Sequence, residues 1–346
     1  CMLHPTPSTT APDPSAAERK TDHVRIAAQP GVEHLSGTGL DRVRLRHRAL
    51  PERDLADVRL GCDLLGRPVR GPLVVSAMTG GTGQAETLNA RLMRAAADHG
   101  IALTLGSGRP LLDDPDLLST YVRAGHPRPP LLIANLGAAQ VRRRDAADRA
   151  RRLVDLLGAD ALSIHLNPVQ EAVQPEGQPE FAGVADAIAR LVAALRPLPV
   201  VVKEVGFGLD PQDVALLRDA GVAAIDVAGS GGTNWAVIEG RRDARAGAVA
   251  AAFADWGVPT ARALCDAVRI APELPIVASG GLRDGVDAAK CLALGAVAAG
   301  VARPLLIAAT QDEAGAAVET LLEQLRVATW AVGAASTSDL GTEHLA

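Results

Sequence analysis

The sequence predicts an α/β fold: a (β/α)8 TIM barrel with an N-terminal extension over the barrel mouth. Eight short apolar runs follow one another from residue 72 onward, and runs that are apolar throughout are typical of parallel strands buried on both faces. The segments between them, such as "DAADRARRLVDLLG", are apolar on one helical face and charged on the other. Eight such strands fit a closed barrel. The alternative, a doubly wound open sheet, usually has fewer strands and a glycine-rich turn after its first strand.

The eight apolar runs give the expected strands in chain order. They lie at residues 72–78, 101–107, 130–135, 161–167, 199–205, 223–229, 275–281 and 296–302. Around them we expect a disordered, Pro/Ser/Thr/Ala-rich tail (1–17), an extension that contributes a substrate-binding arm (18–71), the barrel (72–335) and a C-terminal tail (336–346).

Composition excludes several classes of protein. The net charge of −5 over 346 residues argues against nucleic acid or an anionic membrane as a partner recognised by bulk charge. The first 20 residues lack an apolar signal-peptide core, and no apolar run reaches the length of roughly 18 residues that spans a membrane. Four cysteines without a C-x-x-C pair indicate a reduced, cytoplasmic protein without a disulfide frame or a structural zinc.

Polar side chains follow the expected strands, at the carboxyl ends where barrels carry their functional groups. A common rim would therefore bring together Ser76, Met78, Thr79, Ser107, Arg109, Asn135, His165, Asn167, Gln170, Glu171, Lys203, Glu204, Ser230, Thr233, residues 279–283 and Arg303.

Two glycine-bearing loops predict a phosphate site. "SGGLRDG" (279–285) and "GVARP" (300–304) follow the seventh and eighth strands, where barrels often hold a phosphate on backbone amides and a helix N-terminus. The alternative is a tight turn with two solvated arginines. Together with "AGSGGTNW" (228–235), the loops suggest one elongated ligand such as flavin mononucleotide (FMN). A phosphosugar would also fit the phosphate loops, but would leave Met78, Thr79 and Asn135 without a role.

Lys203 is one of only three lysines and lies inside the apolar strand "PVVVKEV". Burying an ammonium group is costly unless it is paired or takes part in chemistry. Lys203 is therefore a snorkelling edge residue, a Schiff-base nucleophile, or a cation beside a flavin ring carbonyl, where it would stabilise the reduced, anionic ring.

The segment "SIHLNPVQEAVQPEG" (163–177) ends a strand in several polar groups. Glu171 reads as an oxygen ligand for Mg²⁺, which prefers one or two carboxylates plus substrate phosphates, or else as an exposed carboxylate. His165 is either a core histidine or, on the same strand face as Asn167, a residue of the mouth. Upstream, "ERKTDHVR" (18–25) is a solvated helix start or an arm that clamps an anionic substrate.

These pieces resemble one family, the type 2, flavin-dependent isopentenyl-diphosphate isomerases. The resemblance covers roughly residues 18–335, and its most specific segments are "HLNPVQE" and "AMTGG". The other segments that carry it are "RKTDHV", "ALPE", "LGSGR", "ANLGA", "VKEVGFGL", "AGSGGTNWAVIE", "SGGLRDGVDAAKCLALGA" and "GVARPLL".

The resemblance implies a role for each matching position. FMN would be bound by Ala77, Met78, Thr79, Ser107, Asn135, Lys203, Thr233, Gly281, Leu282, Arg283, Ala302 and Arg303. The substrate diphosphate would meet Arg19, Lys20, Ser107, Gly108 and Arg109, with Gln170 against the isoprenoid part and Glu171 holding Mg²⁺. The catalytic residues would be Gln170, His165, Asn167 and Lys203.

The implied reaction interconverts isopentenyl and dimethylallyl diphosphate by a 1,3-proton shift without net redox change. Since the rim offers no strong side-chain acid, our hypothesis is that reduced FMN supplies the proton, with NADPH as reductant. The family also implies a homo-oligomer, a tetramer or octamer. Two positions depart from its pattern: Gly108 stands where Gln is frequent, and Ala228 where a hydroxyl residue is common.

Three other functions remain open from the residues. An FMN-dependent 2-hydroxyacid oxidase would need a histidine base in the loop after the sixth strand, and "AGSGGTNW" has none. A Schiff-base aldolase would use Lys203 as its nucleophile. A flavin-binding regulatory barrel would not need Arg19, Lys20, Gln170 and Glu171, all of which are present.

Overall fold

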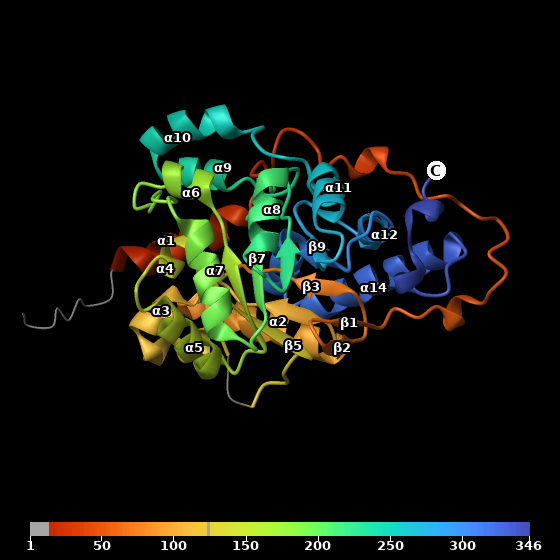
Figure 1. Cartoon of the computed structure of the whole chain (residues 1–346), viewed down its shortest axis with the longest axis horizontal. Coiled ribbons are helices and arrows are strands. Elements are labelled where there is room, and N and C mark those ends of the chain that lie inside the picture. The colour runs from red at the N-terminus through yellow and green to blue at the C-terminus, as the bar shows by residue number, and fades with distance from the viewer. Residues whose placement is uncertain (1–13, 123–124) are drawn as a thin grey trace, which may run out of the picture.

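The computed structural model describes residues 14–122 and 125–346, so most of the predicted tail at 1–17 lies outside the described residues. Eight parallel strands close into a barrel in the order β10-β3-β4-β5-β6-β7-β8-β9 (Figure 1), which confirms the predicted fold. They are β3 (Leu73–Val75), β4 (Ala102–Thr104), β5 (Leu131–Gly137), β6 (Ala161–His165), β7 (Val200–Lys203), β8 (Ala224–Asp226), β9 (Ile276–Ala278) and β10 (Ala298–Val301).

Helix α1 precedes the strands and lies at the barrel mouth, and the other helices follow barrel strands, most of them covering the outside of the barrel (Figure 1). The helices are α1 (Pro14–Ala27), α2 (Gly83–His99), α3 (Arg109–Asp113), α4 (Ala138–Val141), α5 (Ala146–Leu157), α6 (Pro168–Val173), α7 (Val184–Leu195), α8 (Pro211–Asp219), α9 (Trp235–Arg242), α10 (Ala244–Ala250), α11 (Thr260–Ile270), α12 (Gly285–Ala293), α13 (Arg303–Thr310) and α14 (Ala314–Ala331). Among the described residues, no helix is both long and apolar enough to cross a membrane.

Local sequence explains where these helices begin and end. Helix α8 starts at a capping box, in which Asp210 accepts from the Gln212 amide and Asp213 accepts from the Asp210 amide. Helix α5 ends at Gly158, whose left-handed backbone (φ 58°) suits glycine. Leu153 of the same helix is completely buried. Replacing it by Ala is therefore expected to lower the free energy of unfolding by about 2–5 kcal/mol.

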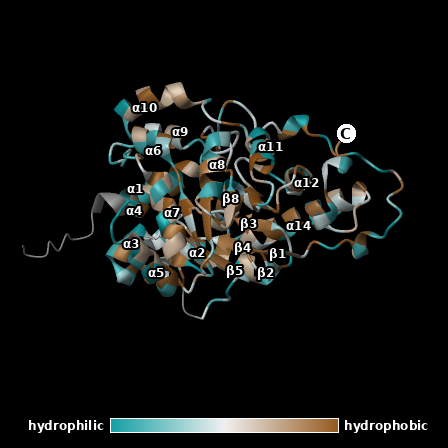
Figure 2. Cartoon of the chain, in the orientation of Figure 1, coloured by the Kyte–Doolittle hydropathy of each residue, from teal (hydrophilic) through white to brown (hydrophobic). Residues whose placement is uncertain are grey.

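A short antiparallel hairpin, β1 (Cys62–Leu64) and β2 (Arg67–Val69), precedes the barrel and was not predicted. Its side chains Leu64 and Val69 pack in one cluster with residues from the amino ends of the barrel strands, including Ala102, Leu131 and Ala161. The hairpin therefore covers the amino end of the barrel. Hydrophobic residues gather on the strands in the centre of the molecule, and hydrophilic ones on the peripheral loops (Figure 2).

The N-terminal extension lies over the opposite, carboxyl end, as the fold prediction states. Helix α1 packs against α9, and Glu33 pairs with Thr233 in an antiparallel bridge. The His34 amide donates to the Gly232 carbonyl at 2.9 Å, and the Arg303 Nε donates to the Ala27 carbonyl at 2.8 Å. Backbone hydrogen bonds and one arginine thus hold residues 27–34 across the barrel mouth.

The rest of the extension runs along the outside of α11, α12 and α14 toward the C-terminus (Figure 1). The Ala261 amide donates to the Thr38 carbonyl, and Lys290 donates to the Leu40 carbonyl. The C-terminal residues 336–346 pair with it, since the Ala346 amide donates to the Arg44 carbonyl at 2.9 Å.

Candidate active site

A cavity of about 550 Å³ opens at the carboxyl end of the barrel, within the size range of small-molecule sites. The segments that follow all eight barrel strands line it, and α1 with residue 33 covers one side. Nearly all predicted site residues lie in its wall: Arg19, Lys20, Ala77, Met78, Thr79, Ser107, Arg109, Asn135, His165, Asn167, Gln170, Glu171, Lys203, Thr233, Gly281, Leu282, Arg283, Ala302 and Arg303.

Gly108, predicted to contact substrate, is the exception, because it is not part of the cavity wall. A side chain at this position would collide with Leu153 of helix α5. Its amide donates to the Asn135 carbonyl at 2.7 Å, so its structural role is to let the loop after β4 pass close to α5. Ala228, the second departure, does line the cavity and has an unusual positive φ of 36°.

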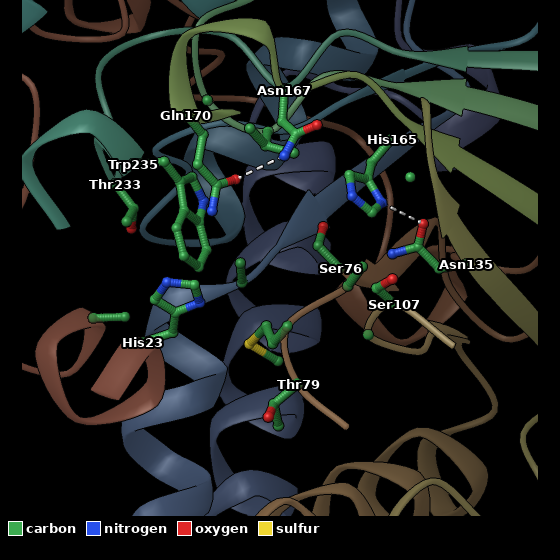
Figure 3. Close-up of a pocket in the computed structure, with 18 of the residues that line it drawn as sticks. His23, Ser76, Thr79, Ser107, Asn135, His165, Asn167, Gln170, Thr233 and Trp235 are labelled. Atoms are coloured by element: carbon green, nitrogen blue, oxygen red, sulfur yellow. Dashed lines mark hydrogen bonds between the residues drawn. The ribbon is translucent and has the colours of Figure 1, made fainter. Parts of the chain in front are cut away.

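His165 and Asn135 form a hydrogen-bonded pair in the cavity wall, with 3.0 Å between His165 Nδ1 and Asn135 Oδ1 (Figure 3). Burial lowers the pKa of His165 to about 3, and the positive charges of Lys203 and Lys20 act in the same direction. The imidazole is therefore neutral at physiological pH. It can give and accept hydrogen bonds, but it is a weak base.

The segment after β6 forms a network of amides and carboxylates. Asn167 Nδ2 donates to Gln170 Oε1 at 3.1 Å (Figure 3). It also donates to Glu171 Oε1 at 3.0 Å. The Gln178 amide donates to Glu171 Oε2 at 2.6 Å. These bonds orient the Glu171 carboxylate at the cavity wall.

Glu239 of helix α9 completes this network, and the sequence analysis missed it. Its buried carboxylate accepts from Gln170 Nε2 at 2.9 Å and from Arg242 at 2.6 Å. His23 Nε2 of α1 lies 2.8 Å from its Oε1. Burial raises the pKa of Glu239, but its contacts with His23, Gln170 and Arg242 outweigh burial and lower it overall. The signal that could have found it is a carboxylate one helical turn after Trp235 in "WAVIEG".

Trp235 and His23 form an aromatic wall beside Gln170. Their rings meet edge to face, with centroids 5.2 Å apart, and Figure 3 shows the indole next to the Gln170 side chain. An indole and a neutral amide suit a small hydrocarbon better than a charged group. This side of the cavity therefore differs from the cationic side formed by Arg19, Lys20 and Arg109.

Three cations gather where α1 meets the loop after β4. Lys20 Nζ donates to the Gly80 carbonyl at 2.5 Å and lies 3.3 Å from the Tyr121 hydroxyl. Burial, with the charges of Arg19 and Arg109, lowers the pKa of Lys20 to about 7. Burial and the charge of Arg109 also lower the pKa of Arg19. Such a cluster is unfavourable alone and favours a strongly anionic ligand.

The wall near β3 and β9 fits a flavin. Ser76 Oγ and Thr79 Oγ1 are buried at the cavity wall and lack a hydrogen-bond partner among the described residues, so each can bond a ligand or a water molecule. Gly281 has φ 77°, and a side chain at Gly232 would collide with its backbone. These glycines leave room for a ligand to approach the chain closely.

The two predicted phosphate-binding arginines lie in the cavity wall but already have acidic partners. Arg283 pairs with Asp287 at 3.0 Å, and Arg303 pairs with Glu33 at 2.7 Å. Because these charges are already paired, the backbone amides of residues 280–281 are further candidates for binding an FMN phosphate.

Lys203 reaches the cavity from the end of β7. Its Nζ donates to the Glu204 carbonyl. Glu204 Oε2 accepts from the amides of residues 205–207, and burial nevertheless raises the pKa of Glu204 to about 7.

Among the described residues, no group of three or more His, Cys, Asp or Glu side chains could hold a metal ion alone. Glu171 therefore offers a single carboxylate. That fits Mg²⁺ shared with substrate phosphates and argues against a metal held by protein ligands only.

Comparison with known proteins agrees with this site. The sequence model of the FMN-dependent dehydrogenase family matches residues 138–346. An isopentenyl-diphosphate delta-isomerase of Xanthobacter autotrophicus is 48% identical, over 96% of this chain and 98% of that protein. The isomerase of a Nostoc species is 43% identical, over 92% of this chain and 91% of that protein. The isomerase of Methanothermobacter thermautotrophicus is 39% identical, over 94% of this chain and 91% of that protein.

Solved structures with the same fold include a mandelate oxidase variant with benzaldehyde and a flavocytochrome b2 variant with bound pyruvate. The first has a TM-score of 0.65 at 24% identity, covering 95% of this chain and 93% of that one. The second has a TM-score of 0.70 at 19% identity, covering 95% and 82%. At these identities the likeness shows the fold alone. The identity and coverage of the isomerases, with the FMN-dependent family match, show that the chain belongs to the FMN-dependent, type 2 isopentenyl-diphosphate delta-isomerases.

Proposed function

We propose that the protein interconverts isopentenyl diphosphate and dimethylallyl diphosphate for isoprenoid biosynthesis, by a 1,3-proton shift that requires reduced FMN and Mg²⁺. NADPH is the proposed reductant. The observation that carries this proposal is a single cavity with three parts: unsatisfied polar groups and glycines for a flavin, a cation cluster for a diphosphate, and an amide–indole wall for a hydrocarbon.

The cation cluster is the proposed diphosphate site. Lys20, Arg19 and Arg109 face the same part of the cavity, and the lowered pKa of Lys20 reflects the burial and repulsion that an anion would relieve. We propose that Glu171, oriented by Asn167 and the Gln178 amide, holds Mg²⁺ on the diphosphate.

Gln170 is the proposed contact to the isoprenoid part. Glu239 accepts from its Nε2 and Asn167 donates to its Oε1, so the amide is fixed by hydrogen bonds on both sides. The Trp235 indole adds apolar surface to the same wall. When bound and reduced, FMN supplies the acid–base group beside the alkene. Lys203 is the proposed partner of its pyrimidine edge, and the neutral His165–Asn135 pair adds hydrogen bonds without adding charge.

The site is less suited to the alternative functions. A 2-hydroxyacid oxidase needs a histidine base, and His165, whose pKa falls to about 3, is a weak one. The loop 228–235 contains no histidine. A Schiff-base aldolase would need a free Lys203 amine, which here donates to the Glu204 carbonyl. The homo-oligomer and the cytoplasmic location remain predictions.

The test combines absorbance with an isomerisation assay. The purified protein should show a bound flavin spectrum and should isomerise isopentenyl diphosphate only when Mg²⁺ is present and NADPH or dithionite has reduced the flavin. Full turnover by flavin-free protein would contradict the proposal. So would a reduced, flavin-loaded protein that has Mg²⁺ and still leaves the substrate unchanged.

A further inference from the structure

Three neighbouring strands carry chemically active side chains at the same level of the barrel. His165 of β6 is in register with Lys203 of β7, and Lys203 is in register with Asp226 of β8. In-register residues on neighbouring strands point to the same face of a sheet. Lys203 and Asp226 are both buried. Lys203 lies in the cavity wall, whereas Asp226 does not.

A buried ammonium group needs a nearby negative charge, and the hydrogen bond of Lys203 to the Glu204 carbonyl supplies only a dipole. Two buried carboxylates are candidates. The charge of Lys203 acts on both, but Glu204 Oε2 already accepts from the three amides of residues 205–207. Asp226 is the better candidate, because it is the one in register with Lys203.

Asp226 is held in place by Ser279, which follows β9 on the other side of β8 from β7. Ser279 Oγ donates to its Oδ1 at 2.6 Å, and the Ala228 amide donates to the same oxygen at 3.2 Å. Burial raises the pKa of Asp226, and the charge of Lys203 opposes this rise. The charge of Lys203 therefore acts on a buried carboxylate that lies outside the cavity wall.

We infer that Asp226 is the buried counter-charge of Lys203 and a positioning residue that limits the positive potential the cavity presents to bound FMN. The inference rests on FMN binding as part of the proposed function. A negative charge behind Lys203 opposes accumulation of electron density on the flavin. Asp226 thus lowers the affinity of the cavity for reduced FMN relative to oxidised FMN, and with it the midpoint potential.

The direct test is to measure the midpoint potential of FMN in the Asp226→Asn variant. The redox titration is monitored by flavin absorbance in the absence of substrate. Asparagine has the same shape and keeps an oxygen for Ser279 and the Ala228 amide. We expect the potential to rise, with a gain of about threefold or more in the ratio of affinities for reduced and oxidised FMN. An unchanged or lower potential would overturn the inference.

The matched control is Asp160→Asn, which removes one negative charge at the other end of the barrel. Asp160 pairs with Arg67 and Arg128 just before β6. Its variant should leave the potential unchanged. An equal rise in this control would show an effect of net charge rather than of Asp226, and would also overturn the inference.

A double-mutant cycle tests the pairing through stability. Lys203→Met leaves a buried carboxylate unpaired, so Asp226→Asn should be less destabilising in the Lys203→Met protein than in the wild type. Thermal unfolding of the four proteins at saturating FMN measures this coupling. Additive shifts would exclude the pairing. If Asp226→Asn alone fails to fold, the pairing predicts that adding Lys203→Met restores folding, and failure of both proteins would also exclude it.

These outcomes separate the inference from the proposed function. A wild-type protein that binds FMN but does not isomerise isopentenyl diphosphate would refute the proposed function, and the predicted potential shift could still be measured. A shift that is absent while isomerisation is intact would refute the inference alone.

Discussion

The two ends of the barrel treat charge in opposite ways. At the amino end, Asp160 is paired with Arg67 and Arg128 and also accepts from the Leu132 amide at 2.9 Å. At the carboxyl end, burial shifts the pKa of Lys20 to about 7 and that of His165 to about 3. The first end compensates its charges within the chain, and the second keeps polar groups that the chain leaves incompletely paired.

This difference teaches where to look for chemistry in such a fold. Each barrel strand runs from one end of the barrel to the other, and the residues between the two ends are buried. Only the carboxyl end combines buried cations with hydroxyls that lack a partner among the described residues, Ser76 and Thr79. Polar groups held at such a cost in stability are typical of sites that a ligand completes. Substitutions at the two ends should therefore differ in kind: loss of function at one, a modest loss of stability at the other.

The largest contrast is expected between Glu171→Gln and Asp160→Asn. Loss of the proposed Mg²⁺ ligand should reduce Mg²⁺-dependent isomerisation by about a hundredfold or more, while the flavin absorbance stays. Steady-state kinetics across a Mg²⁺ titration measures this. Asp160→Asn should change turnover by less than about twofold, because its charge contacts no part of the cavity. Equal effects of the two changes would erase the distinction between the ends.

Glycines sharpen the comparison. Gly280 has φ 100°, and a side chain there would collide with the Gly229 backbone, so Gly280→Ala should lower stability by about 3 kcal/mol and weaken FMN binding. Gly100, at the amino end, has φ 66° and would meet the flexible side chain of Arg70. Gly100→Ala should lower stability by about 1 kcal/mol and leave FMN affinity unchanged. Denaturant unfolding and flavin titration test both variants.

The pH dependence of substrate binding should reveal the pKa of Lys20. In the free protein this pKa is lowered to about 7, and a bound diphosphate should raise it because the anion stabilises the protonated ammonium. The affinity for the diphosphate substrate should therefore be greatest below pH 7 and fall by up to about tenfold per pH unit above it. Protonation of the substrate itself adds a separate pH dependence, which is the same for every variant.

Lys20→Arg provides the control, because a guanidinium keeps its charge. The decline above pH 7 should disappear in this variant. KM values between pH 6 and 9 measure the difference. If KM of the wild type depends on pH in the same way as KM of the arginine variant, Lys20 is charged over the whole range from pH 6 to 9, which would contradict the prediction.

The smallest effect is expected for Arg67→Ala. The Arg67 side chain is about half exposed, so its pair with Asp160 should contribute less than about 1 kcal/mol, and Arg128 remains to pair the carboxylate. Thermal unfolding should shift slightly, and turnover should stay at the wild-type rate. A clear loss of turnover would show that the amino end affects the cavity.

The sequence predicts the barrel well because every one of its strands is buried on both faces. Seven of the eight expected runs contain their strand and extend further, as residues 72–78 do around β3 (Leu73–Val75). The apolar run is longer than the strand because residues of the following loop, beyond the last pair of hydrogen-bonded strand residues, are buried too. The exception is β5 (Leu131–Gly137), which continues two residues past the expected run 130–135. The hairpin β1–β2 was missed because three-residue strands with exposed positions show no clear period.

Site residues divide in a similar way. Those at strand ends, such as Asn135 and Lys203, could be predicted because topology alone brings strand ends together. Glu239 and Asp226 could not, because their roles depend on which side chain on another element they face. Both have a detectable signal, an acidic residue within an apolar pattern: "WAVIEG" for one and "AAIDVAG" for the other.

The segment of residues 27–34 that crosses the barrel mouth also has a consequence for the order in which parts of the protein can fold during synthesis. Residues 27–34 leave the ribosome early, yet they bond to Gly232, Thr233 and Arg303. At the usual rate of about 5–20 residues per second, the first of these partners appears roughly 10–40 seconds later. Residues 27–34 can therefore complete these contacts only after almost the whole barrel has been synthesised, because their last partner, Arg303, follows the final strand β10.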